Sequence, residues 1–95
     1  MKTRDIRIGQ KKAVGFEISL PGAPLLLARG DKGFVMCGYL DMSVADKFGQ
    51  AAAVVRGIKT LDELLEKPVA DVSAKGKRRG IKPGMTGLQA LQKLV

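Results

Sequence analysis

Residues 33–40 read Gly-Phe-Val-Met-Cys-Gly-Tyr-Leu, and every position in this stretch is apolar, aromatic or glycine. Successive side chains of a strand point to opposite faces, so a strand here would present apolar groups on both sides. One face would carry Phe34, Met36, Gly38 and Leu40, and the other Val35, Cys37 and Tyr39. We therefore predict a central strand that is covered on both faces, by its own fold or by another copy of the chain.

The chain before this stretch has the pattern of three further strands joined by short turns. Residues 3–8 and 11–20 flank Gly9-Gln10, a glycine-first pair that suits a tight type II′ hairpin. In the second strand we expect one face to be buried, with Val14, Phe16, Ile18 and Leu20, and the other to face water, with Ala13, Gly15, Glu17 and Ser19. A Pro-Gly turn and a short apolar strand at 24–28 follow. Four consecutive strands with short turns predict an antiparallel meander.

From Ser43 onward the apolar residues follow helical spacing, interrupted by two short strands. In order, we expect a helix at 44–48 capped by Ser43, a strand at 51–56, a helix from the Thr60 capping box to before Pro68, a strand at 69–72, a helix at 73–79, and a last helix opened by Thr86. The strand, helix and strand over 51–72 should form a right-handed crossover unit. The fold class is therefore α+β: an N-terminal antiparallel four-strand meander followed by helix-strand-helix-strand and C-terminal helices, in a single domain over residues 1–95.

Composition limits the classes of protein that fit. The chain has 95 residues and a net charge of +8, and the charge gathers in residues 1–12, at +4, and in residues 75–82, at +5. The apolar runs are too short to span a membrane, and the charged N-terminus lacks the apolar segment of a signal peptide. A single cysteine makes no internal disulfide, which suits a reducing compartment. We expect a cytoplasmic protein without membrane partners.

Candidate chemistry is narrowed by the absence of histidine, which excludes a Cys-His or Ser-His nucleophile pair and every imidazole metal site. Cys37 is the remaining nucleophile, and its apolar neighbours favour a packing role over attack. We predict no catalytic residue, no metal site and no cofactor.

One candidate anion site is the loop before the last helix, with Arg79, Lys82, Gly84, Thr86 and Gly87. Glycines there would let the backbone approach a phosphate or carboxylate, and the helix entry would offer free amides. Such turn-and-cap sequences are also ordinary helix entries.

An alternative partner is nucleic acid, bound without sequence preference through basic side chains. The candidates are Arg4, Arg7, Lys75, Lys77, Arg78 and Arg79. The basic run contains no aromatic residue, and we expect the aromatic side chains Phe16, Phe34, Tyr39 and Phe48 to be mostly buried. Stacking on single-stranded bases is therefore unsupported.

Several segments resemble the YunC-like domain-of-unknown-function family of small bacterial and archaeal proteins. The likeness rests on residues 25–28, 32–40, 51–57, 62–65, 80–87 and 90–91. It implies an α+β domain whose N-terminal β region, about residues 1–40, mediates assembly into a tetramer, and it implies no activity. Under this resemblance the residues of the central strand become candidates for an oligomer interface or for the core, namely Phe34, Met36, Cys37 and Tyr39.

Together these observations predict a small homo-oligomeric module that is structural or binds a small anion. Nucleic-acid binding is the first alternative. An enzyme with a site completed between subunits is the second, and it is the less favoured class because no catalytic constellation is visible.

Overall fold

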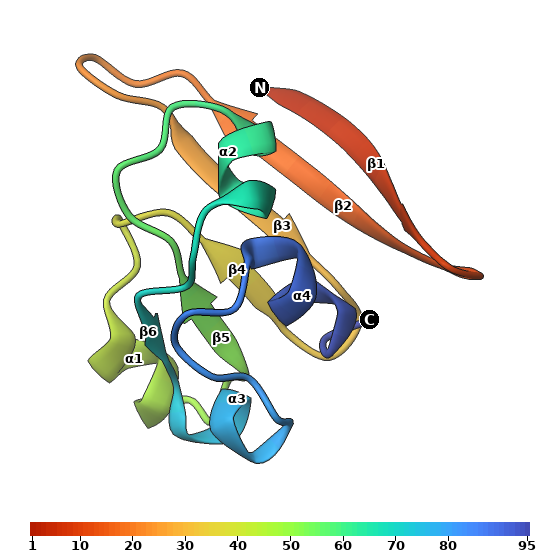
Figure 1. The fold of residues 1–95 in the computed structure, drawn as a ribbon. Coiled ribbons are helices and arrows are strands. Elements are labelled where there is room, and N and C mark those ends of the chain that lie inside the picture. Colours follow the sequence, from red (N-terminus) through yellow and green to blue (C-terminus); the bar gives the residue numbers. More distant parts are fainter.

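The computed structural model describes all 95 residues as one six-stranded sheet with four short helices (Figure 1). In chain order the elements are β1 (Lys2–Ile8), β2 (Lys11–Ile18), β3 (Leu25–Arg29), β4 (Phe34–Met36), α1 (Met42–Lys47), β5 (Ala52–Val54), α2 (Leu61–Glu66), β6 (Asp71–Val72), α3 (Ala74–Arg78) and α4 (Gly87–Gln92). The α+β class is confirmed. The sheet is larger than the predicted four-stranded meander because β5 and β6 continue it.

The strands lie in the sheet in the order in which they follow one another in the sequence. Neighbours from β1 to β4 are antiparallel, as are β5 and β6, whereas β4 and β5 are parallel. Parallel neighbours need a long connection, and here α1 lies within it. The crossover predicted for residues 51–72 is therefore wrong: β5 and β6 run antiparallel, and the crossover lies one element earlier.

The central strand is shorter than the pattern of residues 33–40 predicts. It ends at Met36, and Gly38 and Tyr39 belong to a turn. Val35 and Cys37 are buried, whereas Phe34 and Met36 remain half-buried and Tyr39 is 52% exposed. The chain covers one face of this strand fully and the other only in part.

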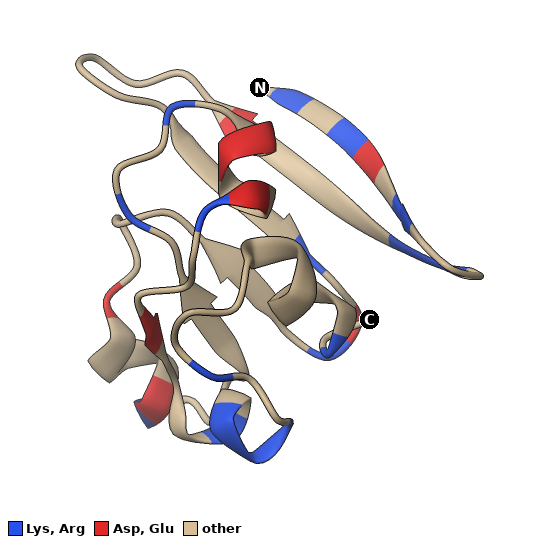
Figure 2. Ribbon diagram, in the orientation of Figure 1, with Lys and Arg blue, Asp and Glu red and all other residues tan.

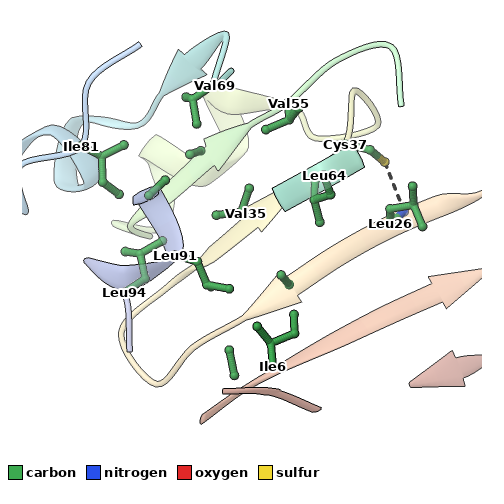
Figure 3. Close-up of a cluster of buried hydrophobic side chains, with 14 of the residues drawn as sticks. Ile6, Leu26, Val35, Cys37, Val55, Leu64, Val69, Ile81, Leu91 and Leu94 are labelled. Carbon is green, nitrogen blue, oxygen red and sulfur yellow. Dashed lines mark hydrogen bonds between the residues drawn. The ribbon is translucent and has the colours of Figure 1, made fainter. Parts of the chain in front are cut away.

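The main core lies between the sheet and helices α2 and α4, which lie against β2, β3 and β4 in Figure 1. Figure 3 shows the buried side chains that meet there, among them Leu26, Val35, Leu64, Leu91 and Leu94. The two helices cross closely at Gly87, where an added Cβ would lie 1.8 Å from the Leu64 carbonyl oxygen. Only glycine fits this contact.

Helix caps follow the predicted chemistry at two of three places. Thr60 caps α2, and Thr86 forms a full capping box with Gln89 at the start of α4. The predicted cap of α1 is wrong, because Asp41 rather than Ser43 occupies that position. The Asp41 carboxylate accepts from the Ser43 N–H at 3.0 Å and from its hydroxyl at 2.6 Å. These bonds lower the pKa of Asp41, with the hydroxyl contributing most.

Ser73 joins three segments at the end of β6. Its hydroxyl oxygen accepts from the N–H of Ala52 at 2.9 Å and of Gly76 at 3.1 Å, and the hydroxyl donates to the carbonyl of Gln50 at 2.7 Å. Ser73 is fully buried and is the one polar residue of the buried set. It therefore caps α3 and also fixes that helix to the start of β5.

Candidate functional site

The sheet has a second face over β2, β3 and β4 that carries large apolar side chains without a helix against them. Strand register places seven apolar residues on this surface, which we call the outer sheet face: Val14, Phe16, Ile18, Leu25, Leu27, Phe34 and Met36. All seven keep part of their surface in water, and Ile18 is 36% exposed. Leu27 lies at the centre, opposite Phe16 on one side and Met36 on the other.

The orientation of β2 is the reverse of the predicted one. Ala13 and Gly15 point toward the helices and are buried, whereas Val14 and Phe16 point away from them and are half-buried. The reason is close approach by α2, because a Cβ at Gly15 would lie 3.1 Å from the Leu61 side chain. Small side chains thus face the helices, and the bulky ones face outward.

On the outer side the chain covers only β5. Ala52 and Val54 share the outer face with Phe34 and Met36 by register, yet both are fully buried. Ala45, the buried residue of α1, lies with them outside the main core cluster. Over β2 to β4 the apolar side chains of this face are only partly covered.

The four residues predicted for an interface or for the core take two different places. Cys37 belongs to the core cluster, whereas Phe34 and Met36 lie on the outer sheet face, where Met36 also packs against the core. Tyr39 lies in the turn beyond β4, and its hydroxyl donates to the carbonyl of Ala23 at 3.3 Å. The prediction that the aromatic residues are mostly buried is wrong, since Tyr39 is 52% and Phe48 68% exposed.

Cys37 also lines an open cavity of about 290 Å³. Its other lining residues are Ala23, Pro24, Gly38, Tyr39, Gly57 and Ile58. The Cys37 sulfur accepts from the Leu26 N–H at 3.3 Å, which Figure 3 marks. No cationic side chain and no base line this cavity, so nothing in it activates a thiolate. The geometry fits the predicted packing role.

The loop predicted to bind an anion uses its backbone donors within the protein. The N–H of Gly84 donates to the Val69 carbonyl at 2.9 Å, and that of Gly87 to the Lys67 carbonyl at 3.0 Å. Thr86 is engaged on both sides by Gln89, with donor to acceptor distances of 2.9 and 3.1 Å. Arg79 and Lys82 are exposed cations beside this closed loop. Anion binding by these residues stays a prediction.

The residues predicted to contact nucleic acid lie in two groups, near opposite edges of the sheet. Arg4 and Arg7 belong to β1, at one edge, and Arg4 pairs with Asp62 at 3.0 Å. Lys75, Lys77 and Arg78 belong to α3, which follows β6 at the other edge. Figure 2 shows these two basic groups apart, with acidic residues on α2 near β1. The structure does not bring them into one surface.

The acidic side chains form no metal-binding group, and none of the helices has the length and apolarity needed to cross a membrane. Glu63 accepts from the Lys59 N–H at 2.9 Å and pairs with Lys67 at 3.3 Å. The Lys59 bond, followed by the Lys67 side chain, lowers the pKa of Glu63. This carboxylate thus supports the start of α2.

Comparison with known proteins assigns the chain to a family. The model of the family described as "Domain of unknown function (DUF1805)" matches residues 36–94. The chain belongs to the DUF1805 family. It is similar to the uncharacterised protein YunC of Bacillus subtilis, with 32% identity over 82 residues that cover 82% of this chain and 81% of YunC.

The fold of this chain is similar to that in the crystal structure of a protein of unknown function, TA1206 from Thermoplasma acidophilum. The two share 39% identity with a TM-score of 0.94, over 99% of this chain and 92% of that one. The family model and the match to YunC confirm the predicted resemblance to YunC-like proteins. The DUF1805 match begins at Met36, so the β1 to β3 region lies outside the family model but inside the shared structure.

Proposed function

We propose that this DUF1805 protein is a self-assembling module whose copies pack through the outer sheet face. The observation that carries the proposal is the orientation of the sheet, with the small residues of β2 against the helices and seven larger apolar residues of β2, β3 and β4 facing outward. Contiguous exposed apolar patches on soluble proteins mark interaction sites. We propose a second copy of the chain as the partner, because every molecule of this protein in solution carries the same apolar face.

The size of the outer sheet face limits how much of an interface it supplies. Its three strands lie about 4.8 Å apart and are about 27 Å (β2), 17 Å (β3) and 10 Å (β4) long, which gives a footprint of roughly 250 Å² in projection. A stable interface buries about 800 Å² of accessible surface per partner, so a contact of that size must extend beyond these three strands. Two such faces would pack about 10 Å apart as a sandwich related by a two-fold axis. A tetramer, which the family resemblance implied, requires a second contact of the N-terminal β region beyond this one.

The second part of the proposal is that the module binds a small anion. It rests on the net charge of +8 and on cations without acidic partners, since only three ion pairs form. We keep this as a binding function without catalysis, because no base lies in the cavity that Cys37 lines.

A matched pair of variants tests assembly. Ile18 and Leu88 are each 36% exposed, but Ile18 lies on the outer sheet face and Leu88 on α4 at the opposite layer. We expect Ile18→Lys to lower the assembly mass in sedimentation equilibrium and Leu88→Lys to leave it unchanged. An equal effect of both variants, or none, would refute an interface on this face.

A further inference from the structure

A cavity of about 240 Å³ opens where the parallel strands β4 and β5 begin. Three cations line it: Arg29 at the end of β3, Lys32 in the following turn, and Lys75 in α3. We propose that this cavity binds a small oxyanion with two or more negative charges, such as phosphate or pyrophosphate. The site deepens the anion-binding part of the proposed function and does not depend on assembly.

The charge of the cavity is unbalanced. No acidic residue lines it, and none of its three cations has a carboxylate within 4.0 Å. By contrast, the three ion pairs of the chain engage other cations: Arg4, Lys12 and Lys67. Three cations around one cavity repel one another, and a multivalent anion between them reverses that repulsion. The arginine fork also matches the geometry of phosphate oxygens.

The floor of the cavity is main chain with little side-chain cover. At Gly33 the backbone packs directly against the Ala51 carbonyl oxygen, which an added Cβ would approach to 2.1 Å, so this side of the cavity is closed. On the other side Gly49 has a φ of +65° and open space around its Cβ position. A ligand can therefore approach the backbone closely at Gly49.

Ala51 supplies a free donor at this cavity. Its carbonyl accepts from the Phe34 N–H at 3.1 Å, so the backbone of Ala51 faces β4. Its own N–H donates to no protein acceptor, although the residue is only 2% exposed. Buried backbone donors are rarely left without a partner, and an oxyanion in this cavity would provide one.

The helix that carries the third cation is fixed by the Ser73 contacts. Lys75 follows Ser73 by two residues, and Ser73 fixes the start of α3 to Ala52 and Gln50. Lys75, which is distant in the sequence from Arg29 and Lys32, is thus brought to the same cavity at the start of β4 and β5. This attachment lowers the conformational cost of gathering three cations around a ligand.

Calorimetric titration of the full chain with inorganic pyrophosphate and with inorganic phosphate, at constant ionic strength, tests the site. We expect Arg29→Gln and Lys75→Gln each to weaken binding at least about 10-fold, the scale of one charged hydrogen bond. Arg79→Gln and Lys82→Gln test the competing loop predicted from the sequence. Arg56→Gln and Lys59→Gln are the matched controls, because they remove the same charge at exposed positions outside both sites, and they should leave binding within about 2-fold. In a parallel NMR titration, the amide resonance of Ala51 should shift upon ligand addition.

Other results would distinguish an error in the location of the site from an error in the anion-binding function. If binding is lost in the Arg79 and Lys82 variants but kept in the Arg29 and Lys75 variants, the module binds anions and this site is wrong. An equal loss in the cavity variants and in the Arg56 and Lys59 controls would indicate general charge attraction and would also overturn the site. Absence of binding to either anion would reject the anion-binding function itself, whereas the assembly mass is measured independently.

Discussion

Replacement of Ser73 by alanine should destabilise the fold more than the loss of an ordinary helix cap. The change removes a cap, worth about 1 kcal/mol. It also leaves the Ala52 N–H without its acceptor in a fully buried position, which costs about 1–3 kcal/mol. The Gln50 carbonyl loses its donor as well, but Gln50 is exposed and water can replace the bond. The expected loss is about 2–4 kcal/mol.

Urea denaturation followed by circular dichroism measures this loss. The total stability of a domain is about 5–15 kcal/mol, so the effect is a large share of it and should lower Tm by about 10–25 °C. Thr60→Ala is the matched control, because Thr60 caps α2 with one bond to Glu63 and is exposed. It should cost about 1 kcal/mol. Equal losses in the two variants, at equal protein concentration, would show that the buried bonds of Ser73 contribute nothing.

Three further predictions concern other parts of the fold. Gly87→Ala should cost about 1–3 kcal/mol or more in urea denaturation because its methyl group would overlap the Leu64 carbonyl, and unchanged stability would contradict the close packing of α2 on α4. Glu63 should titrate below its ordinary pKa of 4.5 by NMR, so that its contribution to stability is present above that pH and is lost as pH falls through the lower value of the folded state. Lys67→Gln should raise this pKa only partly, since the Lys59 backbone bond remains, and a wild-type midpoint at or above 4.5 would refute the reasoning. Cys37 should react with a thiol reagent far more slowly in the native protein than in concentrated guanidinium chloride, and comparable rates would show that it is accessible.

The sequence predicted best those features that depend on neighbouring residues. The Thr60 and Thr86 caps are local hydrogen-bond patterns, and both are present. The α1 cap was missed because Asp41 and Ser43 are both good capping residues two positions apart, and the pattern does not choose between them. The short strand β5 lies within the predicted residues 51–56 because glycines flank its apolar run.

The features that the sequence did not predict depend on contacts between distant segments. Alternation in β2 separates its residues into two faces, but it does not say which face meets a helix. We predicted that the face with the bulky residues is the buried one. Gly15 was the available signal, because a glycine inside a strand often marks a close approach. The cationic cavity was missed because Lys75 joins Arg29 and Lys32 only through the pairing of β4 with β5.

The central claim is that the outer sheet face joins copies of this DUF1805 protein, and its most direct test is the mass of the protein in solution. Sedimentation equilibrium at micromolar concentration should give a multiple of the 10.1 kDa chain mass for the wild type. Leu27→Lys places a charge at the centre of the face, between Phe16 and Met36, and should shift the mass toward that of one folded chain. A wild-type protein that sediments as a 10.1 kDa monomer, or a Leu27→Lys variant that assembles as the wild type does, would contradict the claim.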